Sequence, residues 1–448
     1  MRVRFFYLPF LRATLYNPLM KPASRIESTI EILEKIAEQT RVPMDSVVGD
    51  YMRNRRYIGS KDRSEIAERV YNIARARARL NWWLEQQKQA LSPRNITLAW
   101  LILGENLDEK RVNDLFDGSK YAPAALNEQE KSFANALLGQ SLNSDEMSAA
   151  VRVECPPEHE EALSALYGED FEKELSAMLE SATLDLRVNL FQITRENAAG
   201  SLAKDGIETE PTPLSPWGLR CTDKAYLSKA KAMNKGWVEI QDEGSQMIAY
   251  LCGAKPGMQV LDFCAGGGGK TLALASAMQR KGRIVAMDNN TKRLERGRRR
   301  YKKAGIADIV ELRSLEEEQH RKWLRRQKEK FDIVLTDVPC SGTGTWRRNP
   351  DMRWANYGPS LTELIEVQAE ILEKAAKNVK PGGKLVYATC SLLRAENENQ
   401  IESFLANHPE FELQPVPEEL GSPYMRLSPY RHNTDGFFAA ILVKKNEE

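Results

Sequence analysis

The stretch that decides the fold is Val260-Leu-Asp-Phe-Cys-Ala-Gly-Gly-Gly-Gly-Lys-Thr271. A short apolar strand runs into glycines that let the backbone turn tightly and let a ligand approach it closely, and the turn opens a helix. Further apolar runs follow at 283–287, 309–312, 331–336 and 384–389, with helical patterns at 271–280, 291–304 and 361–379 between them. Apolar strands that alternate with helices predict an α/β fold with a doubly wound parallel sheet.

The glycine loop, residues 264–270, has an acidic partner. Asp288 ends the next strand, where a carboxylate can accept hydrogen bonds from both ribose hydroxyls of a nucleoside cofactor. The loop and Asp288 together predict such a cofactor, but they do not distinguish a dinucleotide from S-adenosylmethionine. A nucleoside-triphosphate loop is disfavoured, because it needs a glycine five positions before Gly269 and Cys264 stands there.

Two cysteines follow the ends of two later strands. Cys340 lies in Asp337-Val-Pro-Cys-Ser-Gly-Thr-Gly344, after the strand at 331–336, and Cys390 follows the strand at 384–389. A single buried cysteine is usually an inert small hydrophobe. Ligands of open α/β sheets bind at the carboxyl ends of the strands, so two cysteines at this edge, one near an acid, predict a reactive site.

At these residues the chain resembles the RNA cytosine-5 methyltransferases, in their bacterial Fmu/Sun (RsmB-like) branch. The resemblance rests on the segments 260–271, 337–344, 387–391, 347–351, 237–245 and 434–438, and it covers about 230–440. It implies a Rossmann-like class I methyltransferase sheet that uses S-adenosylmethionine and no metal. The residues implied to bind this cofactor are Cys264, Ala265, Gly266, Gly267, Gly268, Gly269, Lys270, Asp288 and Asp337.

The resemblance also implies the roles of three catalytic residues. Cys390 adds to carbon 6 of a cytosine as a thiolate, Cys340 assists removal of the proton on carbon 5 and release, and Asp337 holds the N3/N4 edge of the base. A free thiol has a pKa of about 8.5, so the site must lower the pKa of the attacking cysteine. Lys270 or nearby helix dipoles are candidates for this effect. Ser314 stands about where the family has an acid for the adenine amino group, so Ser314, a nearby Glu or the backbone must replace that acid.

The sequence predicts four regions: an N-terminal extension at 1–24, an all-α domain at 25–148, a small α+β connector at 149–245 and the methyltransferase domain at 246–448. The extension is also compatible with an organelle transit peptide or with a later start at Met20. Ser24 is the expected N-cap of the first helix. The all-α domain resembles a NusB-like RNA-binding domain through residues 59–63 and 70–71. This second resemblance favours small-subunit rRNA as the substrate, with tRNA as the alternative.

The net charge of +1 over 448 residues conceals local asymmetry. Residues 286–350 carry 17 Lys and Arg against 10 Asp and Glu, which fits contacts to an anionic polymer. Arg347 and Arg348 are the preferred RNA contacts, whereas the basic residues of 293–303 form either an RNA contact or a solvated helix face.

The six cysteines include no C-x-x-C pair, so we expect neither a zinc site nor a disulfide framework. Free thiols and the lack of an eighteen-residue apolar stretch predict a cytoplasmic protein without a membrane span, and we expect a monomer. A catalytically silent RNA-binding assembly factor is the alternative function, motivated by Ser314 and by Gly266-Gly267, where the family often has Ala-Pro. A DNA cytosine methyltransferase, with Cys340 as nucleophile, would leave Cys390 unexplained.

Overall fold

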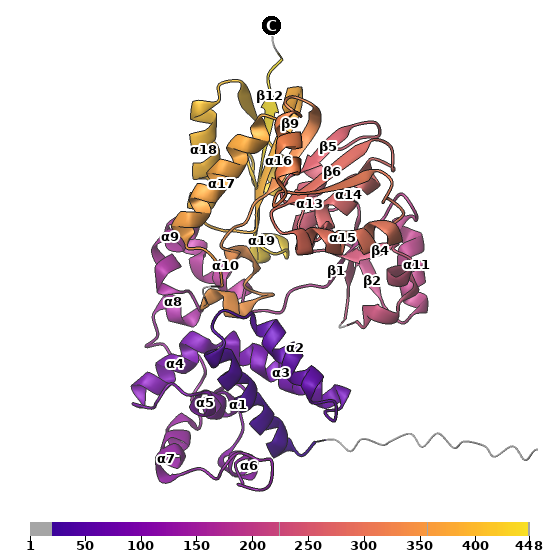
Figure 1. Cartoon of the computed structure of the whole chain (residues 1–448). Helices are drawn as coiled ribbons and strands as arrows, with labels where there is room; N and C mark the ends of the chain where they lie inside the picture. The colour runs from indigo at the N-terminus through magenta and orange to yellow at the C-terminus, as the bar shows by residue number, and fades with distance from the viewer. Residues whose placement is uncertain (1–19, 224, 356, 447–448) are drawn as a thin grey trace, which may run out of the picture. The chain divides into compact units, whose positions relative to one another are not determined.

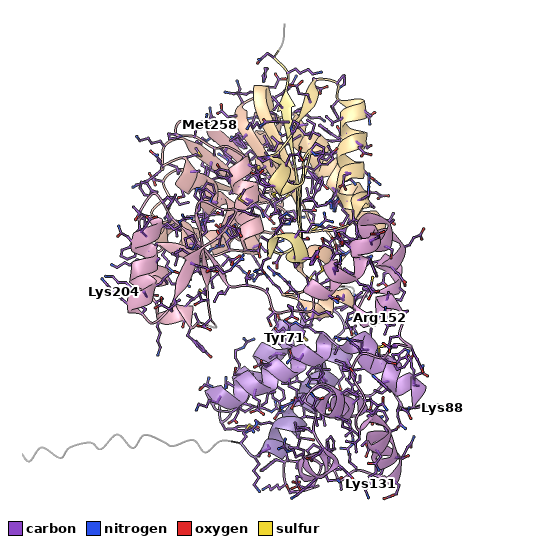
Figure 2. The ribbon with its side chains drawn as sticks, turned by 180° about the vertical axis from the view of Figure 1, so that it is seen from behind. Tyr71, Lys88, Lys131, Arg152, Lys204 and Met258 are labelled. Carbon is purple, nitrogen blue, oxygen red and sulfur yellow. The ribbon has the colours of Figure 1, made fainter. Side chains whose placement is uncertain are left out.

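The computed structural model describes residues 20–223, 225–355 and 357–446. The chain divides into two compact units, Met1–Arg152 and Val153–Glu448, and Arg152 is labelled in Figure 2. Most of the predicted N-terminal extension, residues 1–19, lies outside the described residues.

The described part of the first unit is helical throughout (Figure 1). Its central helix is α5 (Pro93–Leu103), which begins where the Ser92 side chain accepts a hydrogen bond from the backbone N–H of Asn95. Leu98 and Leu101 are fully buried in the core that α5 shares with its neighbours. The other helices are α1 (Pro22–Glu38), α2 (Met44–Asn54), α3 (Ser60–Ala74), α4 (Arg77–Gln86), α6 (Glu109–Leu115), α7 (Glu128–Leu137) and α8 (Ala149–Arg152).

Two expected boundaries are wrong. Helix α1 begins at Pro22 with Lys21 as its N-cap, not at Ser24, because proline suits the first turn, where a backbone N–H has no partner. The strand expected at 186–193 ends at Val188, because the side-chain amide of the next residue, Asn189, donates to the carbonyl of Ala304 at 3.1 Å and the chain turns there.

The second unit begins with two helices and a small antiparallel sheet. The sheet has the order β2-β3-β1-β4, and residues that lie in its strands pack against two short helices. These elements are α9 (Pro157–Tyr167), α10 (Phe171–Ala177), β1 (Asp185–Val188), α11 (Arg195–Lys204), β2 (Thr209–Pro211), β3 (Gly218–Cys221), α12 (Lys231–Asn234) and β4 (Val238–Ile240).

The predicted doubly wound sheet is confirmed. Its order is β10-β12-β9-β8-β5-β6-β7, with β11 paired to β12, and β9, β8, β5, β6 and β7 run parallel. Strand β12 runs antiparallel to both β9 and β10. The strands are β5 (Gln259–Asp262), β6 (Arg283–Asp288), β7 (Val310–Ser314), β8 (Phe331–Asp337), β9 (Val379–Thr389), β10 (Phe411–Gln414), β11 (Met425–Leu427) and β12 (Phe437–Lys444).

Helices cover both faces of this sheet (Figure 1). Val260 packs in a core with residues of α13, α14 and α15, whereas its neighbour Leu261 packs in a second core with residues of α16, α17 and α18. This alternation explains why the strands are apolar throughout. The helices are α13 (Glu243–Leu251), α14 (Gly269–Ala277), α15 (Thr291–Lys303), α16 (Glu318–Arg325), α17 (Leu361–Ala376), α18 (Glu398–Asn407) and α19 (Pro429–His432), with 3-10 turns η1 (Gly168–Asp170), η2 (Leu227–Lys229), η3 (Thr343–Thr345), η4 (Pro350–Arg353), η5 (Arg394–Glu396) and η6 (Glu418–Leu420).

The order of the strands reverses between β5 and β8. Chain connections leave these two strands toward opposite edges of the sheet, so a crevice opens at their carboxyl ends, where ligands of this fold class bind. The glycine loop follows β5, and the two cysteines follow β8 and β9.

Candidate active site

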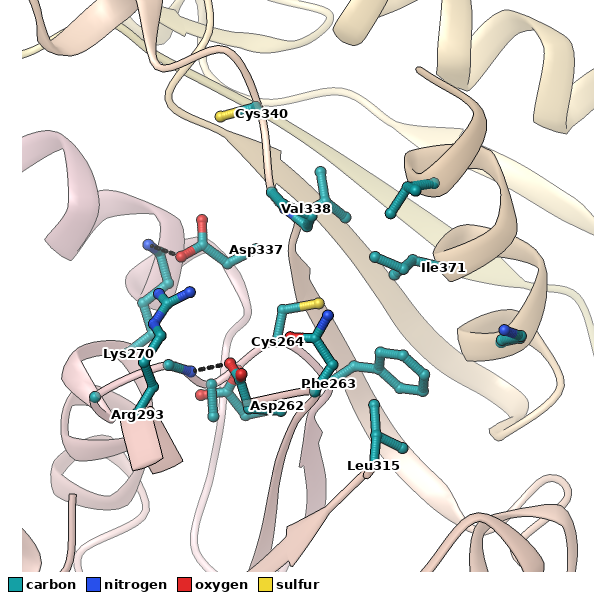
Figure 3. Close-up of a pocket in the computed structure, with 18 of the residues that line it drawn as sticks. Asp262, Phe263, Cys264, Lys270, Arg293, Leu315, Asp337, Val338, Cys340 and Ile371 are labelled. Atoms are coloured by element: carbon teal, nitrogen blue, oxygen red, sulfur yellow. Dashed lines mark hydrogen bonds and ion pairs between the residues drawn. The ribbon is translucent and has the colours of Figure 1, made fainter. Parts of the chain in front are cut away.

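A cavity of about 1580 Å³ lies at this crevice and extends between α16 and α17 (Figure 3). Lys270, Asp337 and Arg293 lie on one side of the close-up, and Phe263 and Ile371 lie on the other. The structure brings the predicted residues together, because all of them except Gly268 line the cavity. They are Cys264, Ala265, Gly266, Gly267, Gly269, Lys270, Asp288, Asp337, Cys340 and Cys390.

The glycine loop is fixed by its own geometry. Gly268 has a φ of +81°, and a Cβ atom there would lie 2.0 Å from the Tyr301 hydroxyl oxygen, so only glycine fits. The backbone N–H of Gly266 donates to Asp288 Oδ2 at 2.8 Å, and the N–H of Asn290 donates to Asp288 Oδ1 at 2.8 Å. Asp288 is thereby oriented toward the cavity with lone pairs left on both oxygens.

Two arginines hold the carbonyls of the same loop. Arg300 of α15 donates from Nη1 to the carbonyl of Gly267 at 2.5 Å, and Arg187 of β1 donates from Nη1 to the carbonyl of Gly269 at 2.7 Å. Burial lowers the pKa of Arg187 to about 10. Sequence reasoning missed Arg187, because nothing within the small sheet indicates a contact 82 residues away.

Lys270 and Asp337 form an ion pair at the cavity wall. Lys270 Nζ donates to Asp337 Oδ2 at 2.6 Å, as the dashed line in Figure 3 shows. Burial lowers the pKa of Lys270, but the charge and hydrogen bond of Asp337 outweigh it, and the pKa is raised overall. The charge of Cys390 acts on the pKa of Lys270 in the same direction.

The two cysteines meet at the lip of the cavity. Their sulfur atoms are 3.4 Å apart, although the residues are 50 positions apart in the chain. The parallel register of β8 and β9, which pairs Asp337 with Ala388, brings the two loops together. The hydrogen bond with Cys390, burial and the charges of Cys390 and Glu396 raise the pKa of Cys340 well above its usual value. The raised pKa favours the protonated thiol of Cys340.

Comparison with known proteins identifies the family. The model of the 16S rRNA methyltransferase RsmB/F family matches residues 249–443, and the model of its ferredoxin-like domain matches 160–226. A protein of Synechocystis sp. named "Probable ribosomal RNA small subunit methyltransferase B" is 30% identical over 412 residues, which cover 86% of this chain and 91% of that protein. The chain belongs to the RsmB/F methyltransferase family.

Other relatives agree with this assignment. The ribosomal RNA small subunit methyltransferase B of Salmonella paratyphi B is 29% identical over 402 residues, which cover 87% of this chain and 92% of that protein. The solved structure of PH0851 is 26% identical with a TM-score of 0.75, over 95% of this chain and all of that one. A methyltransferase homologue from Pyrococcus horikoshii is 27% identical with a TM-score of 0.56, over 66% of this chain and 97% of that one. The chain is an RNA methyltransferase, and membership in this family confirms the prediction of S-adenosylmethionine.

The residues of the cavity fit this cofactor. Asp262, at the end of β5, is fully buried, and its Oδ2 accepts a hydrogen bond from Thr271 at 2.6 Å. Its Oδ1 has no partner among the described residues, so it can accept a hydrogen bond from the cofactor's ammonium group. Burial raises the pKa of Asp262 to about 7. Asp288 would hold the ribose, and the bound cofactor supplies the electrophilic methyl group.

Phe263 and Leu315 line the cavity, whereas Ser314 and Glu316 do not. The Ser314 hydroxyl lies 2.6 Å from that of Thr291, and the exposed Glu316 also accepts a hydrogen bond from Thr291. Ser314, a nearby Glu and the backbone were the three expected replacements for the acid with which the family binds the adenine amino group. Neither Ser314 nor Glu316 lines the cavity.

The predicted RNA contact at Arg347 is wrong. Arg347 is 2% exposed, and its Nε donates to Asp435 at 2.6 Å. Arg348 pairs with Asp435 as well and with Asp242 at 2.7 Å. These arginines neutralise buried acids from distant parts of the chain, which a local excess of basic residues cannot reveal. Burial raises the pKa of Asp242.

No cluster of three His, Cys, Asp or Glu side chains suited to a metal ion lies among the described residues. No helix in the described part of the chain is long and apolar enough to cross a membrane.

Proposed function

We propose that this RNA methyltransferase transfers a methyl group from S-adenosylmethionine to carbon 5 of a cytosine through a covalent adduct on Cys390. The observation that carries the proposal is the pair of sulfur atoms 3.4 Å apart beside the cofactor loop. Methylation of an exocyclic nitrogen or of a ribose hydroxyl needs no cysteine nucleophile. Carbon 5 of cytosine is itself a poor nucleophile, and addition of a thiolate at carbon 6 activates it.

The residues divide the chemistry as follows. The Cys390 thiolate, on which the Lys270 charge acts, would form a bond to carbon 6 and move the electron pair of the C5–C6 double bond to carbon 5. Carbon 5 would then take the methyl group and release S-adenosylhomocysteine. Asp337 binds the N3/N4 edge of the base during the addition, held in place by its ion pair with Lys270. A base then removes the proton from carbon 5, and the bond between Cys390 and carbon 6 breaks to restore the aromatic ring.

Cys340 becomes suited to act as that base only after the adduct forms. Its raised pKa arises first from the hydrogen bond with Cys390, then from burial and from the charge of Cys390. Alkylation of the Cys390 thiolate removes its negative charge and weakens its hydrogen bond with Cys340, so the pKa of Cys340 falls when a base is needed. Cys340 can then lose its proton to solvent and accept the proton of carbon 5.

We also propose small-subunit rRNA as the substrate, with residues 25–148 as a NusB-like RNA-binding domain, 149–245 as the connector and 246–448 as the catalytic domain. The names of the relatives and the helical first unit support this proposal. A target base must leave any stack to reach the crevice, so an RNA-binding domain would help to present it. Free thiols at the site suit the reducing cytoplasm.

Bisulfite sequencing of rRNA and tRNA from cells with and without the gene tests the substrate. We expect one 5-methylcytosine of the small-subunit rRNA to disappear in the deletion strain and to return with the intact gene. A gene carrying Cys390→Ala is the matched control, and it should not restore the mark. Loss of a methylcytosine in tRNA alone would refute the rRNA substrate, and loss of none would favour the silent assembly factor.

A further inference from the structure

Glu396 is a buried acid beside the two cysteine loops, and it has no part in the proposed mechanism. It ends the 3-10 turn η5 and is 0% exposed. It forms no ion pair with any described residue, although a buried carboxylate is unfavourable without compensation. Its carboxylate is instead compensated by hydrogen bonds from neutral donors.

These donors come from both cysteine loops. Oε1 accepts from the backbone N–H of Ser341 at 2.8 Å, and Oε2 accepts from the Ser341 hydroxyl at 2.5 Å. Oε2 also accepts from the hydroxyl of Ser391. Ser341 directly follows Cys340, and Ser391 directly follows Cys390. One carboxylate therefore joins the residues next to the two thiols.

Other contacts support the same junction. Gln368 of α17 donates from Nε2 both to Glu396 Oε1 at 2.9 Å and to the carbonyl of Pro339 at 2.9 Å. The backbone N–H of Gly344 donates to the carbonyl of Cys390 at 2.9 Å. The cysteine side chains themselves line an open cavity, so the rigidity that keeps the sulfur atoms close comes from these neighbouring residues.

We propose that Glu396 is a positioning residue that fixes the separation of the Cys340 and Cys390 sulfur atoms by clamping the residues that follow them. The clamp rests on geometry alone, whereas its importance for turnover rests on the proposed function. Without the carboxylate, the Ser341 N–H loses its acceptor in a buried place, and the hydroxyls of Ser341 and Ser391 keep only each other and Thr343. The two loops must then shift or admit water to satisfy the N–H.

The test compares Glu396→Ala with Glu396→Gln. Glutamine keeps the clamp, because its oxygen can accept from the Ser341 N–H and from Gln368 while its amide nitrogen donates to the two hydroxyls, which can act as acceptors. Alanine removes the clamp. Glu398→Gln is the matched control, because this acid lies two residues away, is 9% exposed and pairs with Arg426, not with either cysteine loop.

The first measurement is the rate at which diamide oxidises Cys340 and Cys390 to a disulfide, followed by mass spectrometry of the tryptic peptides. Two thiols lose two protons and two electrons to diamide, which becomes a hydrazine, and the sulfurs must close from 3.4 Å to about 2.05 Å. We expect the rate to fall about tenfold in E396A and to stay within about threefold in E396Q and E398Q. No RNA or cofactor is present, so the result does not depend on the proposed function.

The second measurement is methylation of the RNA substrate. Because a misplacement of about 1 Å can reduce a rate by about 100-fold, we expect kcat of E396A to fall by that order while KM for S-adenosylmethionine stays within about threefold. E396Q should recover most of kcat. Should E396A not fold, Ser341→Ala, which removes one hydroxyl of the clamp, carries both measurements with a smaller decrease.

Equal disulfide rates in the wild type, E396A and S341A would overturn the clamp. A loss in E396Q as large as in E396A would also overturn it, because the charge and not the hydrogen-bonded geometry would then matter. A wild-type enzyme that forms the disulfide with the expected dependence on Glu396 but methylates no cytosine would refute the proposed function and leave the clamp standing.

Discussion

At the scale of single residues, the structure places the two predicted thiols in different surroundings. Both are partly exposed to the same cavity and lie 3.4 Å apart. Their surroundings differ, because the Lys270 cation acts on Cys390 whereas the Glu396 carboxylate acts on Cys340. Under the proposed mechanism, this asymmetry suits Cys390 to the attack and Cys340 to the later proton transfer.

The corresponding prediction is that the two alanine variants fail differently. Cys390→Ala cannot form the adduct, whereas Cys340→Ala adds, methylates and then stalls, because elimination needs a base at carbon 5. Each variant should lose turnover by several orders of magnitude, so activity alone does not separate them. On a denaturing gel with substrate RNA we expect a slow protein–RNA band for C340A and none for C390A. The reverse pattern would exchange the two roles, as in the DNA enzymes.

At the scale of elements, the glycine loop owes its shape to parts of the chain that the sequence places far away. The loop lies between β5 and α14, as predicted, but Tyr301 and Arg300 of α15 and Arg187 of β1 fix it from outside. Gly268 does not line the cavity, so its role is to let the loop pass Tyr301.

We predict that Gly268→Ala disrupts the loop. Its φ of +81° is unfavourable for alanine, and the new Cβ would collide with Tyr301, so unfolding free energy should fall by about 1–3 kcal/mol. Calorimetry should show weaker binding of S-adenosylmethionine. Gly267→Ala is the control, because the nearest atom to its Cβ, on Arg300, is 3.5 Å away and its φ is not positive. Equal effects of the two substitutions would contradict this account.

The elements themselves were largely predictable, because strand periodicity and the glycine turn are local signals. The helices at 291–303 and 361–376 and the parallel strands lie where the pattern placed them. The errors at Ser24 and at the end of β1 arise where a proline or a tertiary contact of Asn189 competes with local preference. The pairing of Lys270 with Asp337 and the closeness of the cysteines required the sheet order, which the pattern does not specify.

At the scale of the whole molecule, a buried charge network ties together the second unit. Arg347 joins Asp435, 88 residues later, to Asp242, 105 residues earlier. Arg347 and Asp435 are each 2% exposed at their side chains, so their charges need compensation within this network. Sequence reasoning assigned Arg347 to RNA because the partners lie outside its neighbourhood and basic residues surround it.

This dependence predicts a strong coupling in a double-mutant cycle. Arg347→Met leaves Asp435 with Arg348 as its remaining partner, and Asp435→Asn leaves Arg347 with Asp242, so each should lower the free energy of unfolding by about 3 kcal/mol. Because the second substitution removes the charge that the first one leaves less compensated, the double variant should lose clearly less than the sum. Urea denaturation of the wild type, the two single variants and the double variant measures this coupling.

The exposed pair of Glu295 and Arg298 is the control, and Arg298→Met should change stability by at most about 0.5 kcal/mol. Additive losses for Arg347 and Asp435 would mean that the buried charges are compensated independently, by Asp242 and Arg348, and that this network does not act as one unit.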